Sequence, residues 1–441
     1  MKKKWASLFV VFAIVTSLVA GCGASNKTET SSNSSASKVK VGVIYIGDEN
    51  EGYTEAHMKG IADMKKTLNL SDSQVIEKTS IPEDETCYEA AVDLADQGCT
   101  IIFANSFGHE SYMMQAAQKY PDVQFCHATG YQAASSGLSN MHNYFTDVYE
   151  SRYVSGVVAG LKINDMIKSG KITADKAKMG YVGAYPYAEV VSGYTSFYLG
   201  AKSVCDSVTM EVQYTNSWAD MSKEGEVATQ LIANGAVLIS QHADTTGAPS
   251  VCEKKNIPVV GYNVDMTSIA PNQALTSASI NWAPYYTYAV KSVIDGTAID
   301  TDWCKGYADD ADSITTLNTK AVAAGTADKV KEVEAAIKSG TLHILATTSF
   351  HDGLKAKPHV QHINSGDLAL DFSLECVVDI SVQITRYCIV VSGTGNEHLR
   401  NVVAVTSSVI EQQTVMSSTT LNDFEFAGVN ERDIVWNVLH G

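Results

Sequence analysis

The sequence lacks the motifs by which common catalytic and metal sites are recognised. It has no GxSxG elbow, no GxxxxGK[ST] phosphate loop, no HExxH pair, and no CxxC pair among its nine cysteines. These absences argue against the usual hydrolase, nucleotide-binding, zinc and redox sites. His359 and His362 have a metal-like spacing but no companion ligands, and the Gly-Thr-Gly at residues 393–395 is too short for a nucleotide loop. We therefore expect no enzymatic activity, no cofactor and no metal.

Positive charge is also scarce. The chain of 441 residues has a net charge of −17 and a pI near 5.0. An acidic surface repels phosphate backbones, so nucleic acid is not an expected partner. Beyond residue 20, no apolar run approaches the about 20 residues of a membrane-spanning helix. The composition, 45% hydrophobic and 18% charged, is typical of globular proteins, and the length allows two or three domains.

The N-terminus has the pattern of an export signal. Lysines at positions 2–4 precede an apolar segment from Trp5 to Ala20, which is followed by Gly21-Cys22. This pattern predicts a signal peptide over residues 1–21. Cys22 with its small neighbours resembles the lipobox of bacterial lipoproteins, which implies lipidation at Cys22 and attachment to the membrane. The alternative is an ordinary secretory signal that contains a cysteine by coincidence.

Residues 22–37 follow as the lipidated cysteine and a tether. The segment is rich in Ser, Asn and Thr and has no aliphatic anchor, so it cannot bury enough apolar surface to offset the entropy of ordering it. Ser-rich segments behave as flexible coils, and a spacer between membrane and folded body is the expected role. A terminus without any role would have the same composition.

From residue 38 onward, strand and helix patterns alternate. Residues 39–46 and 99–104 are apolar strand-like runs, and residues 53–70 have helical periodicity. Such alternation predicts parallel sheets with helical crossovers, hence an α/β protein. One series spans residues 38–145, predicted as lobe 1, and a second spans residues 146–283, predicted as lobe 2. Residues 284–345 are expected to return to lobe 1.

Polar and aromatic residues follow the predicted strands at six or seven places. Ligands of parallel sheets bind outside the carboxyl ends of the strands, so these loops are expected to face each other across a cleft between the lobes. Rings combined with a few amides and carboxylates suit a flat heterocycle. Stacking contributes roughly 1–3 kcal/mol per base, and the polar groups can pair with its edge.

Five of these loops together resemble the basic membrane protein family, the purine-nucleoside-binding lipoproteins of ABC importers. The segments, in chain order within residues 38–343, are Gly47–Tyr53, Asn105–Gly108, Thr215–Trp218, Gln241–Asp244 and Gly261–Met266. The resemblance implies a type I periplasmic-binding-protein fold, in which two parallel-sheet lobes close by a hinge on a purine base or nucleoside. It also implies ABC permease subunits as partners and a lipid-anchored position on the extracytoplasmic face of the cell membrane.

The same resemblance implies the residues that contact the ligand. Rings would come from Tyr53 and Trp218, hydrogen bonds from the polar members, and the full set is Asp48, Tyr53, Ser106, Phe107, Asn216, Trp218, Asp244 and Asp265. The alternative for each ring is a core or hinge position, and for each Asp a helix cap. His242 is more simply a packed neutral histidine.

Two positions depart from the family pattern. Asn263 stands where the family commonly has Asp, and Asn281-Trp282 stands where nucleoside-binding members commonly have a Lys near the sugar. The missing Lys favours a free base such as adenine or hypoxanthine over a nucleoside.

Residues 346–441 form an atypical tail. Three of the four arginines lie in it, lysine is absent after Lys357, and residues 374–391 and 402–410 are β-prone. Three interpretations compete: a small additional β domain, a disordered segment, or the translation of a shifted reading frame. We favour the last two.

Other functions fit the same residues. An enzyme that converts a nucleoside to its base could use Asp48 and Asp244 for acid–base work, although the catalytic motifs are missing. A sensory lipoprotein would present its ligand to a receptor instead of a permease. A sugar-like solute would also bind to stacked rings and carboxylates.

Overall fold

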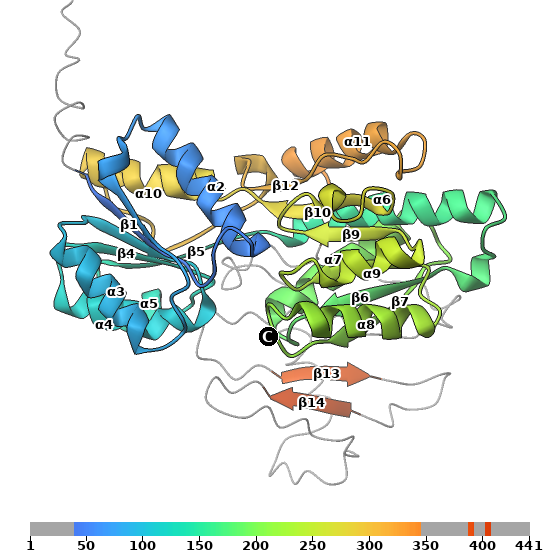
Figure 1. Ribbon diagram of the computed structural model, residues 1–441, viewed down its shortest axis with the longest axis horizontal. Coiled ribbons are helices and arrows are strands. Elements are labelled where there is room, and N and C mark those ends of the chain that lie inside the picture. The colour runs from blue at the N-terminus through green and yellow to red at the C-terminus, as the bar shows by residue number, and fades with distance from the viewer. Residues whose placement is uncertain (1–38, 345–386, 392–401, 407–441) are drawn as a thin grey trace, which may run out of the picture.

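The computed structural model describes residues 39–344, 387–391 and 402–406, and it shows two α/β lobes (Figure 1). The predicted signal peptide, Cys22 and the tether lie outside the described residues, as does most of the tail. Within the tail, the described strands β13 (Tyr387–Val391) and β14 (Val402–Thr406) pair antiparallel. No helix in the described part of the chain is long and apolar enough to cross a membrane.

Lobe 1 is built on a six-stranded parallel sheet with the order β11-β5-β4-β3-β1-β2. Every residue of β1 and β3 is buried, because helices cover both faces of the sheet. The strands are β1 (Val41–Ile44), β2 (Val75–Lys78), β3 (Ile101–Ala104), β4 (Gln124–Ala128), β5 (Met141–Thr146) and β11 (Asp302–Lys305).

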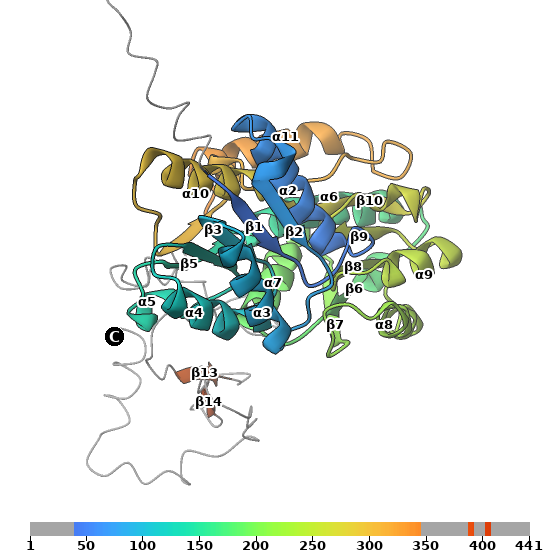
Figure 2. The ribbon, with the colours of Figure 1, turned by 60° about the vertical axis from the view of Figure 1, so that its left-hand side comes forward.

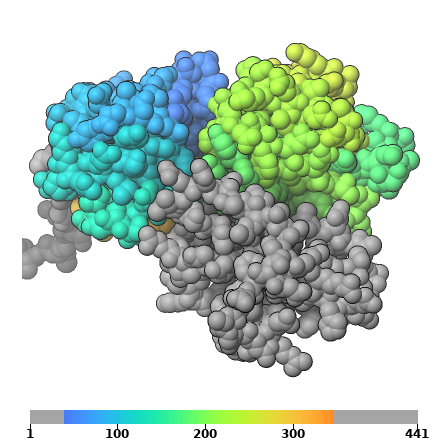
Figure 3. Space-filling model, turned by 90° about the horizontal axis from the view of Figure 1, so that it is seen from below, coloured from blue at the N-terminus to red at the C-terminus, as the bar shows by residue number. Residues whose placement is uncertain are grey.

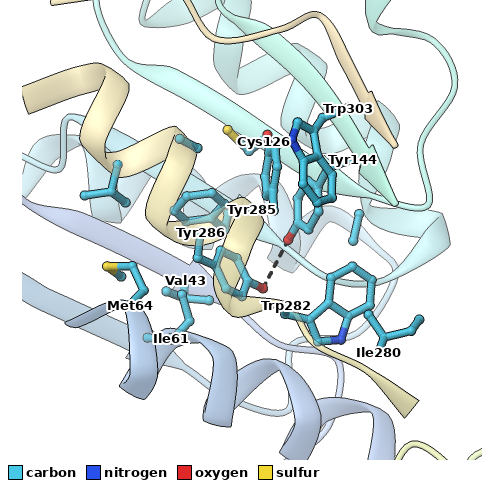
Figure 4. Packing of buried hydrophobic residues seen from close by; sticks show 14 of the residues in the cluster. Val43, Ile61, Met64, Cys126, Tyr144, Ile280, Trp282, Tyr285, Tyr286 and Trp303 are labelled. Carbon is cyan, nitrogen blue, oxygen red and sulfur yellow. Dashed lines mark hydrogen bonds between the residues drawn. The ribbon is translucent and has the colours of Figure 1, made fainter. Parts of the chain in front are cut away.

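Helices cover the lobe 1 sheet from both sides. One face packs against α2 (Gly52–Thr67) and α10 (Ala283–Asp295), and the other against α3 (Glu85–Asp96) and α4 (Glu110–Lys119). Figure 2 shows these layers from a second direction, with the short α5 (Ala133–Ser136) beside α4. The core under α10 is rich in tyrosine: the Tyr144 and Tyr285 rings stack at 3.9 Å, and the Tyr144 and Tyr286 hydroxyls lie 3.1 Å apart (Figure 4).

Lobe 2 repeats the arrangement with the sheet order β12-β10-β9-β8-β6-β7, in which only the edge strand β12 runs antiparallel. The strands are β6 (Lys178–Gly183), β7 (Thr209–Tyr214), β8 (Leu238–His242), β9 (Val259–Tyr262), β10 (Ala274–Ile280) and β12 (Asp312–Ile314). One face packs against α6 (Tyr149–Lys168), α7 (Ala188–Lys202) and α11 (Thr326–Lys338), and the other against α8 (Met221–Ala233) and α9 (Gly247–Lys255).

Short 3-10 helices complete the connections: η1 (Asp72–Gln74), η2 (Phe107–His109), η3 (Ala174–Lys176), η4 (Met266–Ser268) and η5 (Tyr307–Asp309). The six cysteines between residues 39 and 344 are free thiols.

The chain passes between the lobes three times, after β5, after β10 and after β11. Residues 284–345 therefore divide: most of α10 and all of β11 belong to lobe 1, whereas β12 and α11 belong to lobe 2. This corrects the expectation that the whole segment returns to lobe 1. The apolar face of α11, including Val330, Val333 and Ile337, packs in the lobe 2 core, to which the sequence pattern alone could not assign it.

Glycine allows α6 and α7 to approach closely. A Cβ atom at Gly156 would lie 2.1 Å from the Phe197 carbonyl oxygen, and one at Gly200 would lie 2.1 Å from the Tyr153 carbonyl oxygen. The two helices must separate to admit even a methyl group at either position.

We expect Gly156→Ala to lower the free energy of unfolding by about 1–3 kcal/mol, because overpacking displaces backbone in a dense core. Urea unfolding of the purified protein measures the change. Gly225→Ala in α8 is the control, since its Cβ would make an ordinary 3.4 Å contact with Val251 and alanine is favoured in helices by up to about 1 kcal/mol. Equal stability of Gly156→Ala and the parent would contradict this account of the helix contact.

Candidate ligand-binding site

The loops at the carboxyl ends of the two sheets meet at the boundary between the lobes. Gly52, which begins α2 in lobe 1, lies so close to lobe 2 that its Cβ would be 3.3 Å from Val264 and 3.4 Å from the Asp244 carbonyl oxygen. Phe107 of lobe 1 contacts Tyr187 of lobe 2. Figure 3 shows the two lobes as separate masses that meet along this boundary. We call the following set the interlobe site: Tyr53, Phe107, Tyr131, Tyr185, Tyr187, Glu189, Trp218 and Asp244.

Besides Tyr53, five aromatic rings from both lobes gather in one cluster at the interlobe site. The Phe107 ring lies 6.2 Å from Tyr131 and 5.9 Å from Tyr187, nearly parallel to both. In lobe 2, Tyr185 stacks on Tyr187 at 5.1 Å, and Trp218 is tilted 5.3 Å from Tyr185. Phe107 and Tyr187 are 43% and 38% exposed, which is unusual for large rings and leaves their faces available to a ligand.

The spacing of these rings defines a closed arrangement. A flat molecule between two rings needs two carbon–carbon contacts of about 3.5 Å each, or about 7 Å in all. The 5.9 Å between Phe107 and Tyr187 is shorter than that. A base can therefore enter between these two rings only after the lobes move apart.

Two carboxyl groups, exposed Glu83 and buried Glu110, hold the loops that carry the lobe 1 rings. Glu83 Oε1 accepts hydrogen bonds from Ser106 Oγ at 2.6 Å and from the Gly108 amide at 2.7 Å. Glu110 Oε1 accepts the Tyr131 and Gln132 amides, each at 2.8 Å. Each carboxyl group thus accepts two hydrogen bonds from the loop that carries a lobe 1 ring, and it fixes the course of that loop.

A cluster of polar side chains lies at the same boundary, next to α2. Asn263 Nδ2 donates to Asp244 Oδ1 at 2.8 Å, and His242 Nε2 lies 3.0 Å from Glu189 Oε1. The Tyr53 hydroxyl donates to the Asn105 carbonyl oxygen at 2.7 Å, within lobe 1.

Burial sets the protonation of these groups. Loss of hydration raises the pKa of Asp244 well above its usual value, and nearby Glu51 and Glu224 raise it further. Burial lowers the pKa of His242 to about 4, helped by Arg152, so the histidine is neutral as the sequence predicted. A protonated Asp244 can donate a hydrogen bond as well as accept one, which suits the mixed edge of a heterocycle.

The structure brings five of the eight predicted residues to the boundary. Tyr53, Phe107, Trp218 and Asp244 are in the interlobe site itself. Ser106 is adjacent but committed to Glu83, and its carbonyl oxygen lies 2.6 Å from His127 Nε2.

The other three predicted residues serve local turns. Asp48 Oδ1 accepts the Asn50 amide at 2.9 Å, and Asn216 is exposed with a left-handed φ of 53°. Asp265 caps η4 through the Thr267 amide at 2.8 Å, the helix-cap alternative considered above. Ligand contact by these three stays a prediction.

Sequence reasoning missed four members of the site. Tyr185 and Tyr187 follow a predicted strand but match none of the five family segments. Tyr131 and Glu189 carry no local signal at all, since long-range contacts position both. Among the described residues, no group of three or more His, Cys, Asp or Glu side chains could hold a metal ion.

Comparisons with known proteins show which proteins this chain is similar to. The family model described as ABC transporter substrate-binding protein PnrA-like matches residues 38–344. A purine-binding protein of Brucella abortus is 34% identical over 343 residues, which cover 76% of this chain and 90% of that protein. An ABC transporter nucleoside-binding protein of Lactococcus lactis is 22% identical over 263 residues, 58% of this chain and 69% of the other.

Solved structures agree on the fold. A solute-binding protein of an ABC transporter from Conexibacter woesei superimposes with a TM-score of 0.57 at 20% identity, over 69% of this chain and 98% of that one. The predicted two-lobe periplasmic-binding fold is confirmed.

Glu224 generates a pH-dependent prediction. Its Oε1 accepts the Thr245 amide at 3.2 Å beside the interlobe site, and burial raises its pKa to about 7 from an ordinary 4.5. Protonated Glu224 therefore favours the folded state, and this stability is lost as pH rises from about 4.5 through 7. We expect the melting temperature of Glu224→Gln, relative to the parent, to be higher at pH 8 than at pH 5.

Thermal unfolding at both pH values measures this difference. Glu226→Gln, at an exposed position of the same helix, is the control and should show no such trend. The same offset between Glu224→Gln and the parent at both pH values would mean that the Glu224 carboxyl does not titrate as its burial requires.

Proposed function

Because the chain belongs to the PnrA-like family of ABC transporter substrate-binding proteins, we propose that its solute is a purine base held at the interlobe site. Members of this family are extracytoplasmic binding proteins and not enzymes, in agreement with the missing catalytic motifs. The resemblance that five loops predicted is confirmed at the level of the family. The identity of the solute and the residues that hold it are the proposal.

The observation that carries the proposal is the gathering of aromatic rings from both lobes beside Asp244. Stacking is favourable for any flat base and contributes roughly 1–3 kcal/mol for each. Asp244, Asn263 and Glu189 lie within the same boundary and offer both donors and acceptors to a base edge. The purine-binding relative from Brucella abortus supports the same class of solute.

The environment of Trp282 favours a free base over a nucleoside. Trp282 is 1% exposed, and its ring stacks on His57 at 3.9 Å with an interplanar angle of 17°. Burial lowers the pKa of His57 well below its usual value, so this pair supplies no cation where the family pattern has its lysine. A ribose would find no ammonium group at that position.

Uptake would follow from the movement of the lobes. An open form admits the base, and closure brings Phe107 and Tyr187 towards the spacing seen here. The base needs only a higher affinity for the closed form to shift the population towards it. The permease can then distinguish loaded from empty protein by the relative position of the lobes.

We expect Trp218→Ala to weaken binding of adenine or hypoxanthine at least tenfold, or about 1.4 kcal/mol, because a stacking face is lost. Isothermal titration calorimetry measures the affinity. Trp218→Phe keeps a ring and should lose less. A thermal-shift screen with adenine, hypoxanthine, adenosine and glucose identifies the class of solute, since a ligand of the folded state raises the melting temperature. If glucose alone raises the melting temperature, the proposed purine is wrong and the solute is a sugar.

The proposal includes a lipid anchor at Cys22, supported by the sequence of residues 2–22. We expect Cys22→Ser to move the protein from the membrane fraction to the soluble extracytoplasmic fraction, because a stable anchor needs the acyl chains on this residue. Cell fractionation with immunodetection measures the distribution. Cys304→Ser is the control and should stay with the membrane. Membrane retention of Cys22→Ser would refute the anchor.

A further inference from the structure

A cavity of about 670 Å³ lies between α2, the chain crossings after β10 and β11, and α11. The Glu55 and Lys59 side chains of α2 line it from lobe 1, and Asp265 and Glu334 line it from lobe 2. Asp312 stands at the crossing between β11 and β12. The volume is within the range of small-molecule sites, about 300–1,000 Å³. None of the five rings of the interlobe site lines this cavity.

Asp312 and Trp282 are among the residues of the cavity wall whose buried polar atoms lack partners in the described part of the chain. Asp312 is 3% exposed, and its Oδ1 accepts the Thr146 hydroxyl at 2.8 Å, but its Oδ2 is unpaired. Trp282 is 1% exposed, and its Nε1–H is also unpaired. Figure 4 shows this nitrogen on the side of the indole that faces away from Tyr286, next to Ile280, which also lines the cavity. Each unpaired buried group costs about 1–3 kcal/mol, so a ligand that pairs with Asp312 Oδ2 and Trp282 Nε1 would recover part of this free energy.

The charge of the lining favours a cation. Six carboxyl side chains line the cavity against two lysines. Lys59 pairs with Asp63 at 2.5 Å, and Lys338 pairs with Asp310 at 2.7 Å. Four carboxyl groups remain without a lysine: Glu55, Asp265, Asp312 and Glu334.

The arrangement of the carboxyl groups favours an organic cation. No cluster of His, Cys, Asp and Glu in the described part of the chain has a metal-binding arrangement. The four carboxyl groups lie on different elements, from buried Asp312 to exposed Glu55 and Asp265 at the rim. A ligand with two separated ammonium groups can contact both buried Asp312 and the exposed carboxyl groups, which a single compact ion cannot.

We propose that this cavity binds a small aliphatic diamine that carries a hydroxyl or carbonyl oxygen. One ammonium group donates to Asp312 Oδ2, the oxygen accepts from Trp282 Nε1, and the second ammonium group faces the rim carboxylates. This assignment goes beyond the solute-binding role. Its proposed contacts, Asp312 Oδ2 and Trp282 Nε1, are not members of the interlobe site, although Asn263 borders both regions.

Calorimetry on the full-length protein tests the assignment with 1,3-diamino-2-propanol as the probe. Glycerol is the uncharged analogue of the same shape, and we expect it not to bind. Asp312→Asn keeps the acceptor for Thr146 but replaces Oδ2 with an amide nitrogen that donates instead of accepting, and it should weaken binding of the diamine at least tenfold. Asp309→Asn removes an exposed carboxylate that does not line the cavity and should leave the affinity unchanged.

A second pair of measurements isolates the indole. Trp282→Phe keeps an aromatic ring but lacks the N–H, so it should weaken binding of 1,3-diamino-2-propanol and leave binding of 1,3-diaminopropane unchanged. If Asp312→Asn does not fold, the rim variant Glu55→Gln, at an exposed position, should still weaken binding several-fold.

The assignment is overturned if the diamine does not bind to the parent, if glycerol binds equally well, or if Asp312→Asn and Glu55→Gln bind it as the parent does. Titration of adenine into the same variants separates the two proposals. Adenine binding without diamine binding would refute only this cavity site, and the reverse result would refute only the purine site.

Discussion

Carboxyl groups that accept backbone N–H groups hold several loops at the lobe boundary, including those that carry Tyr53, Phe107 and Tyr131. Loops have few ladder hydrogen bonds of their own, and a carboxyl oxygen supplies a replacement acceptor for their backbone N–H groups. The amides held in this way belong to Tyr53 and Thr54 (by Glu51), Gly108 (by Glu83), Tyr131 and Gln132 (by Glu110), Thr245 (by Glu224) and Tyr307 (by Glu150). The acidic composition of the chain thus has a structural use at the boundary.

The same carboxyl groups repel one another at the boundary when they are ionised. Glu51 in lobe 1 and Glu224 in lobe 2 both raise the pKa of Asp244, so bringing the lobes together favours proton uptake at that residue. Glu150, at the crossing between the lobes, has a pKa of about 7 for the same reason of burial. A neutral, flat solute that stacks on rings adds no charge to this region, which fits a purine base better than a phosphorylated or acidic compound.

Local patterns in the sequence predicted the lobes well, and long-range contacts account for what they missed. Residues 101–104 form one continuous apolar run, which is the pattern of a strand buried on both faces, and they form β3. The apolar face of α11 could have packed on either sheet, so periodicity could not assign its lobe. Phe107 and Trp218 were found because they belong to family segments. Tyr131 was not found, because Glu110, far from it in sequence, fixes its position.

The three chain crossings lie at one edge of both sheets, so a rotation of the lobes about them displaces the far strands most. β3, which precedes Phe107, is the fourth strand from β11, and β6, which precedes Tyr187, is the fifth from β12. With strands about 4.8 Å apart, these rings lie roughly 14–19 Å from that edge. A small rotation about the crossings hardly displaces the Thr146–Asp312 bond but separates Phe107 from Tyr187 widely. The gap between these two rings is therefore the most sensitive gauge of how far the protein has opened.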